Sequence, residues 1–95
     1  MSYSDWMSFN KENIDKASVK AGVYFLGSEH ETTYIGASHD IHERLVEHLN
    51  STDACIKGTI SFCYHETLFP EAEEEKQLTA FQYEHGRLPK CNKSK

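Results

Sequence analysis

The sequence lacks the features that mark membrane, secreted and repeat proteins. No apolar run approaches the ~18–20 residues that a membrane-spanning helix needs, and the N-terminal residues contain neither the basic nor the apolar segment of a secretory signal. Only two prolines and five glycines occur in 95 residues, and no repeat or low-complexity linker divides the chain. These absences predict one small globular domain without a membrane partner.

Cysteine is also scarce, and its spacing contains no paired motif. The three cysteines, Cys55, Cys63 and Cys91, are far apart, and none belongs to a CxxC pair. An odd and unclustered set is typical of reduced thiols in a cytosolic protein rather than of a disulfide framework. We therefore expect free thiols and a cytoplasmic location.

The net charge and the absence of several motifs argue against three further kinds of function. The net charge of −5 argues against a simple nucleic-acid binder, which usually has a basic face. Six histidines occur without a cysteine pair or an HExxH motif, which disfavours a structural zinc site. The glycine-rich motifs GxGxxG and GxxxxGK(S/T) are absent, so a phosphate-cradling loop of either kind is excluded.

Apolar and aromatic runs predict three strands, at residues 21–26, 32–35 and 59–65. The first two runs flank a short polar loop and are expected to pair as a hairpin. Helical patterns lie between and after the strands, so we expect an α+β fold with a small three-stranded antiparallel sheet flanked by helices. Residues 1–20 are expected to form an N-terminal extension with one short helix, and residues 21–95 form the domain.

The register of the hairpin is predicted from a turn centred on Glu29. Symmetric pairing about this residue places Tyr24 opposite Tyr34, with the Cβ atoms within ~5.5 Å of each other. Side chains alternate along a strand, so the opposite face is the expected core face and carries Val23, Phe25 and Ile35.

Helix boundaries are marked by residues that satisfy the free backbone groups at helix ends. Asn10 can cap the short N-terminal helix, and Asp40 can cap a helix that starts at the next residue. Glu43 follows Asp40 at the spacing of a capping box. A last helix is expected between Pro70, which suits a first turn, and Gly86, which is a typical stop.

Two tyrosine tripeptides form the most informative pattern, Gly22-Val23-Tyr24 and Tyr34-Ile35-Gly36. The second is followed by Arg44 and His48, which share one edge of the predicted helix because they are four residues apart. A glutamate-bearing helix and Pro89-x-x-Asn92 come later. This arrangement, which extends from Ala21 to Asn92, resembles the GIY-YIG endonuclease superfamily, which includes the N-terminal incision domain of a nucleotide-excision repair nuclease.

The residue types in this pattern suit the hydrolysis of a phosphodiester. The reaction needs an activated water, a cation that stabilises charge on the phosphate, and an acid for the leaving group. Two neighbouring phenols offer proton transfer, although a free phenol has a pKa of about 10 and needs a nearby cation to work at neutral pH. Arg44 offers a permanently charged, bidentate contact to phosphate, and a single carboxylate suits Mg²⁺ or Mn²⁺.

The resemblance implies a role for each matching residue. Tyr24 would be the general base or would orient the water, with Tyr34 assisting it or contacting phosphate. Arg44 would stabilise the transition state, and His48 stands where a histidine often occurs in the family. The expected supporting residues are Gly22, Gly36, His39 and Asn92, the last of which would order the site.

The metal-binding glutamate implied by the resemblance has two candidate positions. Counting back from Asn92 with the repair-nuclease spacing reaches Ala80, which cannot bind a metal. A longer last helix moves the position upstream to Glu74 or Glu75, and Glu74 is favoured because it shares the inward stripe of that helix. Either carboxylate would hold one Mg²⁺ or Mn²⁺ ion.

Ala37 departs from the family pattern, because many relatives have a lysine directly after the second tripeptide. His39 is expected to take over part of the role of that lysine in lowering the phenol pKa. The leading function is a metal-dependent endonuclease that cleaves DNA, with selection for branched, nicked or damaged structures and with specificity supplied by a protein partner. The alternative is a catalytically weak or inactive GIY-YIG-like module that binds nucleic acid or a protein.

Overall fold

The sheet of the computed structural model, which describes residues 3–29 and 31–92, has four antiparallel strands in the order β1-β4-β2-β3. His30 of the predicted hairpin loop and residues 93–95 of the predicted domain lie outside the described residues. The strands are β1 (Met7–Ser8), β2 (Gly22–Ser28), β3 (Glu31–Ser38) and β4 (Ser61–Glu66). The helices are α1 (Lys11–Asp15), α2 (Ile41–Leu49), α3 (Ala54–Lys57) and α4 (Pro70–His85).

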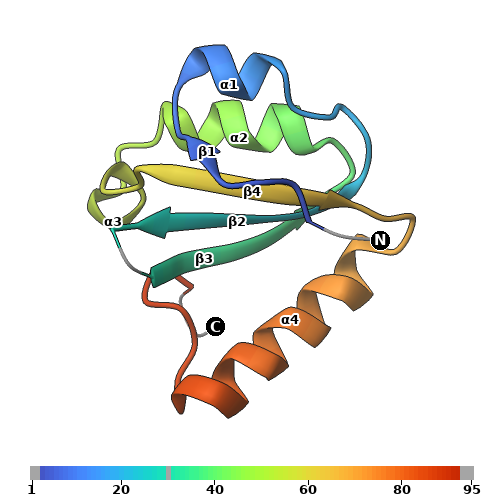
Figure 1. Cartoon of the computed structure of the whole chain (residues 1–95), viewed down its shortest axis with the longest axis vertical. Coiled ribbons are helices and arrows are strands. Elements are labelled where there is room, and N and C mark those ends of the chain that lie inside the picture. Colours follow the sequence, from blue (N-terminus) through green and yellow to red (C-terminus); the bar gives the residue numbers. More distant parts are fainter. Residues whose placement is uncertain (1–2, 30, 93–95) are drawn as a thin grey trace.

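Helices cover both faces of this sheet (Figure 1). α1 and α2 lie on one face, and α4 crosses the other. The predicted α+β class is therefore confirmed, but the prediction of three strands is wrong, because Met7 and Ser8 form a fourth strand that pairs with β4. A two-residue strand is too short to show alternation in a sequence, and its pairing depends on the free edge of β4.

The hairpin register differs by two residues from the prediction. Tyr24 pairs with Gly36, and Tyr34 pairs with Leu26, because the register shifts at Leu26/Gly27 and makes the hairpin asymmetric. A shift of two residues preserves the alternation of side chains, so the two tyrosines still share one face of the sheet.

Both faces of the hairpin are buried, which corrects the expectation of a single core face. Val23 and Ile35 are buried on the predicted core face, which α4 covers. Tyr24, on the opposite face, has no exposed surface either. It belongs to the main hydrophobic cluster, which also contains Ile14, Leu26, Ile41, Leu45 and Phe62.

The predicted helix caps are confirmed, except for the capping box at the start of α2. The Asp40 side chain accepts a hydrogen bond from the Glu43 N–H at 3.0 Å, as expected of an N-cap. The Asp40 N–H donates to Ser38 Oγ at 2.9 Å, so the predicted capping box with the Glu43 carboxylate is wrong. α4 begins at Pro70 and ends before Gly86, whose φ of 73° is the left-handed conformation that favours glycine.

The prediction of three reduced thiols is wrong for two of them. Cys55 and Cys91 form a disulfide across 36 positions of sequence, and only Cys63 is a free, buried thiol. α3, which the sequence did not predict, presents Cys55 to the segment that follows α4. The expectation of a reducing compartment depended on unpaired cysteines, and the disulfide removes that basis.

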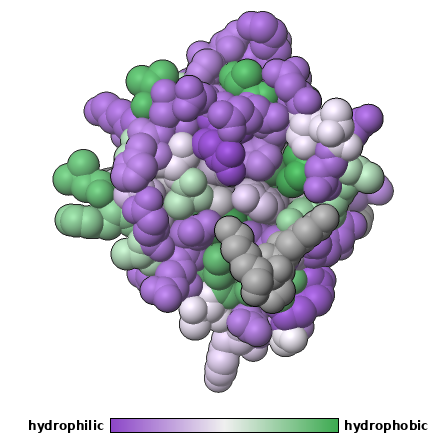
Figure 2. Space-filling view, turned by 180° about the vertical axis from the view of Figure 1, so that it is seen from behind, coloured by the Kyte–Doolittle hydropathy of each residue, from purple (hydrophilic) through white to green (hydrophobic). Residues whose placement is uncertain are grey.

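The surface is mostly hydrophilic on the face that Figure 2 shows, with hydrophobic residues scattered over it. Within residues 3–29 and 31–92, no helix is both long and apolar enough to cross a membrane. The large hydrophobic residues that are exposed come from several parts of the chain: Trp6, Val19, Ile60, Leu68, Phe69 and Tyr83.

We expect Asp40→Ala to lower the free energy of unfolding by about 1 kcal/mol, because the Glu43 N–H loses its acceptor. Glu43→Ala is the matched control and should change it by less than about 0.5 kcal/mol, since the Asp40 N–H donates to Ser38. Urea denaturation of both variants measures the difference. An equal loss in the two variants would contradict this account of the cap.

Candidate active site

A cleft of about 550 Å³ lies beside the outer edge of β3. Its walls come from four regions that are distant in sequence: β3, the end of α2 with the segment into α3, α4, and the segment after α4. The lining residues predicted from the sequence are Tyr34, His48, Glu74 and Asn92. The cleft therefore brings together side chains from four of the five motif segments, and the first tripeptide, Gly22-Val23-Tyr24, does not line it.

Tyr24 lies beneath this cleft and is hydrogen-bonded to its wall. The Tyr24 Oη and His48 Nε2 atoms are 2.8 Å apart. The Tyr34 ring completes an aromatic cluster, with its centroid 6.1 Å from that of Tyr24 and 5.1 Å from that of His48. The two phenols and the imidazole thus form one connected group in which only Tyr24 is fully buried.

The glycines of the two tripeptides leave the space that this cluster needs. A Cβ atom on Gly36 would lie 2.4 Å from Tyr24 Oη and 2.8 Å from the Tyr34 ring. A Cβ atom on Gly22 would lie 2.2 Å from the His65 carbonyl oxygen. Gly36 therefore makes room for the tyrosine opposite it, and Gly22 allows β2 and β4 to approach each other.

Burial controls the protonation of both members of the hydrogen bond. Desolvation raises the pKa of Tyr24 well above its usual value, and the nearby Arg44 guanidinium opposes this only in part. Desolvation, assisted by the charge of Arg44, lowers the pKa of His48 to about 4. At neutral pH the phenol is protonated and the imidazole is neutral, so Nε2 can accept the phenol proton.

Arg44 lies one helical turn before His48 on α2 and is close to Tyr24. Its pKa is raised mainly by the Tyr24 phenol, so it stays a cation at every relevant pH. Its Nη1 atom is 2.8 Å from Glu47 Oε1, and 40% of its side chain is exposed. Part of the guanidinium is therefore open to a ligand, and the bond to Glu47 is exposed enough to be exchanged.

The two candidate glutamates are placed differently. Glu74 is partly buried and lines the cleft together with Tyr34 and His48, whereas Glu75 is exposed and lies outside its lining. His39 is not brought to the tyrosines, because it is exposed and pairs with Glu71 at 3.2 Å. The expected role of His39 in place of the missing lysine stays a prediction, and His39 is not among the residues that line the cleft.

Asn92 attaches the segment after α4 to β3. Its Oδ1 accepts from the Ile35 N–H at 2.8 Å, and its Nδ2 donates to the Ile35 carbonyl at 2.9 Å. Sequence reasoning missed the neighbouring cleft residues Cys91 and Asp53. Asp53 accepts hydrogen bonds at the start of α3, so the N-cap pattern could have identified it. No sequence signal pairs Cys91 with Cys55.

The donor set of the cleft fits one hydrated divalent cation better than a protein cage. Among the described residues, no group of three or more histidine, cysteine or acidic side chains could enclose a metal ion. Mg²⁺ keeps several of its waters and is commonly held by one or two carboxylates together with substrate phosphate. Glu74 supplies one such carboxylate to the cleft that Tyr34 and His48 also line.

Comparison with solved structures assigns the fold to the GIY-YIG endonuclease domains. The chain is similar to the GIY-YIG N-terminal endonuclease domain of UvrC from Thermotoga maritima bound to magnesium, at 22% identity and a TM-score of 0.63, over 88% of this chain and 100% of that chain. A variant of the same domain, with one asparagine replaced by alanine and its catalytic divalent cation bound, matches at 20% identity and a TM-score of 0.63, over 90% and 100% of the two chains. No family model and no curated protein matches the chain.

We expect the stability of the protein to fall as the pH decreases from 6.5 towards 4 because of His48. In this range the unfolded chain protonates this histidine and the folded chain does not, so acid favours unfolding. Urea denaturation at several pH values should show a smaller pH dependence for His48→Gln than for the parent protein. Parallel pH curves would contradict the lowered pKa.

We expect Gly36→Ala to lower the free energy of unfolding by about 1–3 kcal/mol, because the new methyl group overlaps the Tyr24 ring. Gly58→Ala is the matched control, since its nearest neighbour would be 3.5 Å away and its φ of −80° suits alanine. Urea denaturation compares the two variants, and the NMR shifts of the His48 ring report its contact with Tyr24. Equal stability and unchanged shifts in both variants would contradict the packing role of Gly36.

Proposed function

We propose that the protein is a metal-dependent endonuclease that hydrolyses phosphodiester bonds in DNA. The observation that carries the proposal is the hydrogen bond from the buried Tyr24 to His48, which lines a cleft together with Glu74. Arg44, one helical turn before His48, lies close to Tyr24. This arrangement combines a proton relay, a cation for phosphate and a carboxylate for a divalent ion. The GIY-YIG endonuclease fold supports the same reaction.

Tyr24 and His48 would remove the proton from the attacking water together. Because burial holds the phenol protonated, Tyr24 is a poor base alone. Because Tyr24 has no exposed surface in the free protein, substrate binding would first have to admit the water to its Oη. The Oη would then take the water proton while its own proton passes to His48 Nε2 across the 2.8 Å hydrogen bond. The negative phosphate would favour the imidazolium that forms, against the desolvation that keeps the free His48 neutral.

Arg44 would bind a non-bridging oxygen of the phosphate and stabilise the charge that develops there. Its exposed pair with Glu47 would be given up for the stronger contact with the substrate. Glu74 would hold one Mg²⁺ or Mn²⁺ ion, which supplies Lewis-acid stabilisation of the phosphate when bound. Tyr34 would line the same wall and contact the phosphate or support Tyr24.

The negative net charge of the protein would limit which forms of DNA it can bind. A protein with a net charge of −5 gains little from contacts with a long phosphate backbone, so its own affinity for ordinary duplex DNA would be low. We therefore propose that it acts on branched, nicked or damaged DNA, where the scissile strand is accessible. A protein partner would then supply further specificity.

We expect Tyr24→Phe, Arg44→Ala and Glu74→Gln each to slow the nicking of supercoiled and branched DNA by about 100-fold or more in the presence of Mg²⁺ or Mn²⁺. Glu75→Gln is the comparison, since this neighbouring carboxylate lies outside the cleft, and it should remain near the parent rate. Chelation of the metal should abolish the reaction. Gel assays on end-labelled substrates measure all of these rates.

Two results would overturn the proposal. Nicking that is insensitive to all three substitutions would place the reaction elsewhere. A folded parent protein that cleaves no substrate would favour the module that binds without cleaving, an alternative that the acidic charge and Ala37 support.

A further inference from the structure

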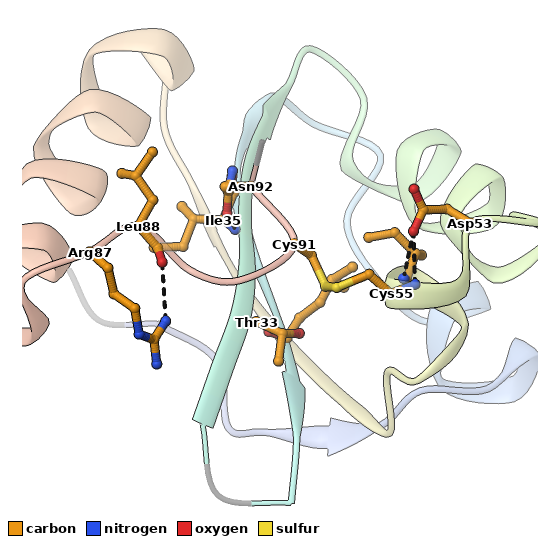
Figure 3. Close-up of a disulfide and its surroundings, with 10 residues drawn as sticks. Thr33, Ile35, Asp53, Cys55, Arg87, Leu88, Cys91 and Asn92 are labelled. Carbon is orange, nitrogen blue, oxygen red and sulfur yellow. Dashed lines mark hydrogen bonds between the residues drawn. A yellow bond between two sulfur atoms is a disulfide. The ribbon is translucent and has the colours of Figure 1, made fainter. Parts of the chain in front are cut away.

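The segment after α4 extends the sheet beyond β3. The Cys91 N–H donates to the Thr33 carbonyl at 2.7 Å, and the Asn92 side chain makes its two hydrogen bonds to the backbone of Ile35. These contacts hold the backbone on either side of Tyr34. Figure 3 shows the segment crossing beside the strand, with Asn92 next to Ile35 and Cys91 near Thr33.

The disulfide fixes this segment to a helix that is itself anchored. Cys55 lies in α3, whose first N–H groups donate to the Asp53 carboxylate at 2.8 and 3.3 Å. Ile56 of the same helix is buried in the main hydrophobic cluster. The Cα atoms of Cys55 and Cys91 are 5.7 Å apart, so the bond joins α3 directly to the residue before Asn92. The cross-link therefore joins two segments that both line the cleft, through Ile56 of α3 and Cys91, and Tyr34 lines the same cleft.

We propose that Cys55 and Cys91 are positioning residues. The hydrogen bonds of Cys91 and Asn92 to Thr33 and Ile35, on either side of Tyr34, form a clamp on the backbone of Tyr34. The disulfide holds this clamp in place, so the activity of the proposed nuclease depends on the redox state of the disulfide. This inference rests on the proposed function. Without the disulfide, Cys91 and Asn92 can still form their hydrogen bonds to β3, but the link to α3 no longer restrains these two residues. We therefore expect the hydrogen bonds to Thr33 and Ile35 to break transiently more often. Cys91 belongs to the main hydrophobic cluster and Cys55 packs against it, so the apolar contacts of both residues remain after reduction. None of the clamp's hydrogen bonds lies in the β2–β4 ladder, so we expect that ladder to be unaffected.

The reductant in this scheme is a small dithiol. Its thiolate attacks one sulfur of the Cys55–Cys91 bond, and Cys55 is the more accessible target because Cys91 is only 6% exposed. The Cys91 thiolate leaves, the second thiol of the reagent displaces Cys55, and both cysteines take up a proton. Two electrons pass to the protein, and the dithiol becomes a cyclic disulfide. Cys63 takes no part, because burial raises the pKa of its thiol to about 12.

Hydrogen exchange followed by NMR tests the positioning role directly in the full chain. On reduction with a dithiol, we expect the Ile35 amide to exchange about tenfold faster, while amides in the β2–β4 ladder exchange as before. Cys55→Ser/Cys91→Ser should show the fast exchange without the dithiol and should not respond to it. Cys63→Ala keeps the disulfide, so it should respond as the parent does, and reoxidation should restore slow exchange.

The nicking assay gives the second readout. The reduced protein should show a kcat at least about fivefold lower with KM changed less than about twofold, because the clamp orders the reacting groups rather than the DNA-binding surface. Unchanged exchange at Ile35, or an equal increase at all amides, would overturn the positioning role. A local increase at Ile35 in a protein that cleaves nothing in either redox state would uphold the clamp and reject the proposed function alone.

Discussion

The burial of one phenol is the constraint on which the rest of the site depends. Tyr24 has no exposed surface, so its hydroxyl must find a partner inside the protein, and that partner is His48. The opposite strand can approach the ring only because Gly36 has no side chain. The packing of the core and the proposed proton transfer therefore depend on the same atoms of Tyr24, so a substitution that alters the packing would also alter the hydrogen bond to His48.

The second constraint on the site is the way in which the outer edge of β3 is covered. Most sheet edges expose unpaired backbone groups, but this one is occupied by Cys91 and Asn92. Cys91 and Asn92 also line the cleft, so the residues that cover the edge of β3 contribute to the site as well. The disulfide to α3 adds a covalent restraint at that point, where a small domain has few residues available to hold a loop.

The acidic surface and a phosphate substrate are compatible only if the attraction is local. Arg44 lies close to the Tyr24 phenol, and Glu47 offsets its charge in the free protein, whereas the cleft lining itself carries the carboxylates of Asp53 and Glu74. A divalent ion on Glu74 would then supply much of the positive charge that a phosphate needs. Such a site would favour substrates that expose one strand over those that offer a long, regular backbone.

The sequence by itself determined the α+β class, most element positions, the caps at Asn10 and Asp40, and the sharing of one face by Tyr24 and Tyr34. These features depend on local spacing, which alternation and helix periodicity reveal. Only the tertiary structure decided the two-residue strand β1, the shifted hairpin register, the exclusion of His39 from the cleft and the bond between Cys55 and Cys91. Each of these features depends on contacts between residues that are far apart in the sequence. Residue spacing describes only local structure, so it cannot reveal such contacts.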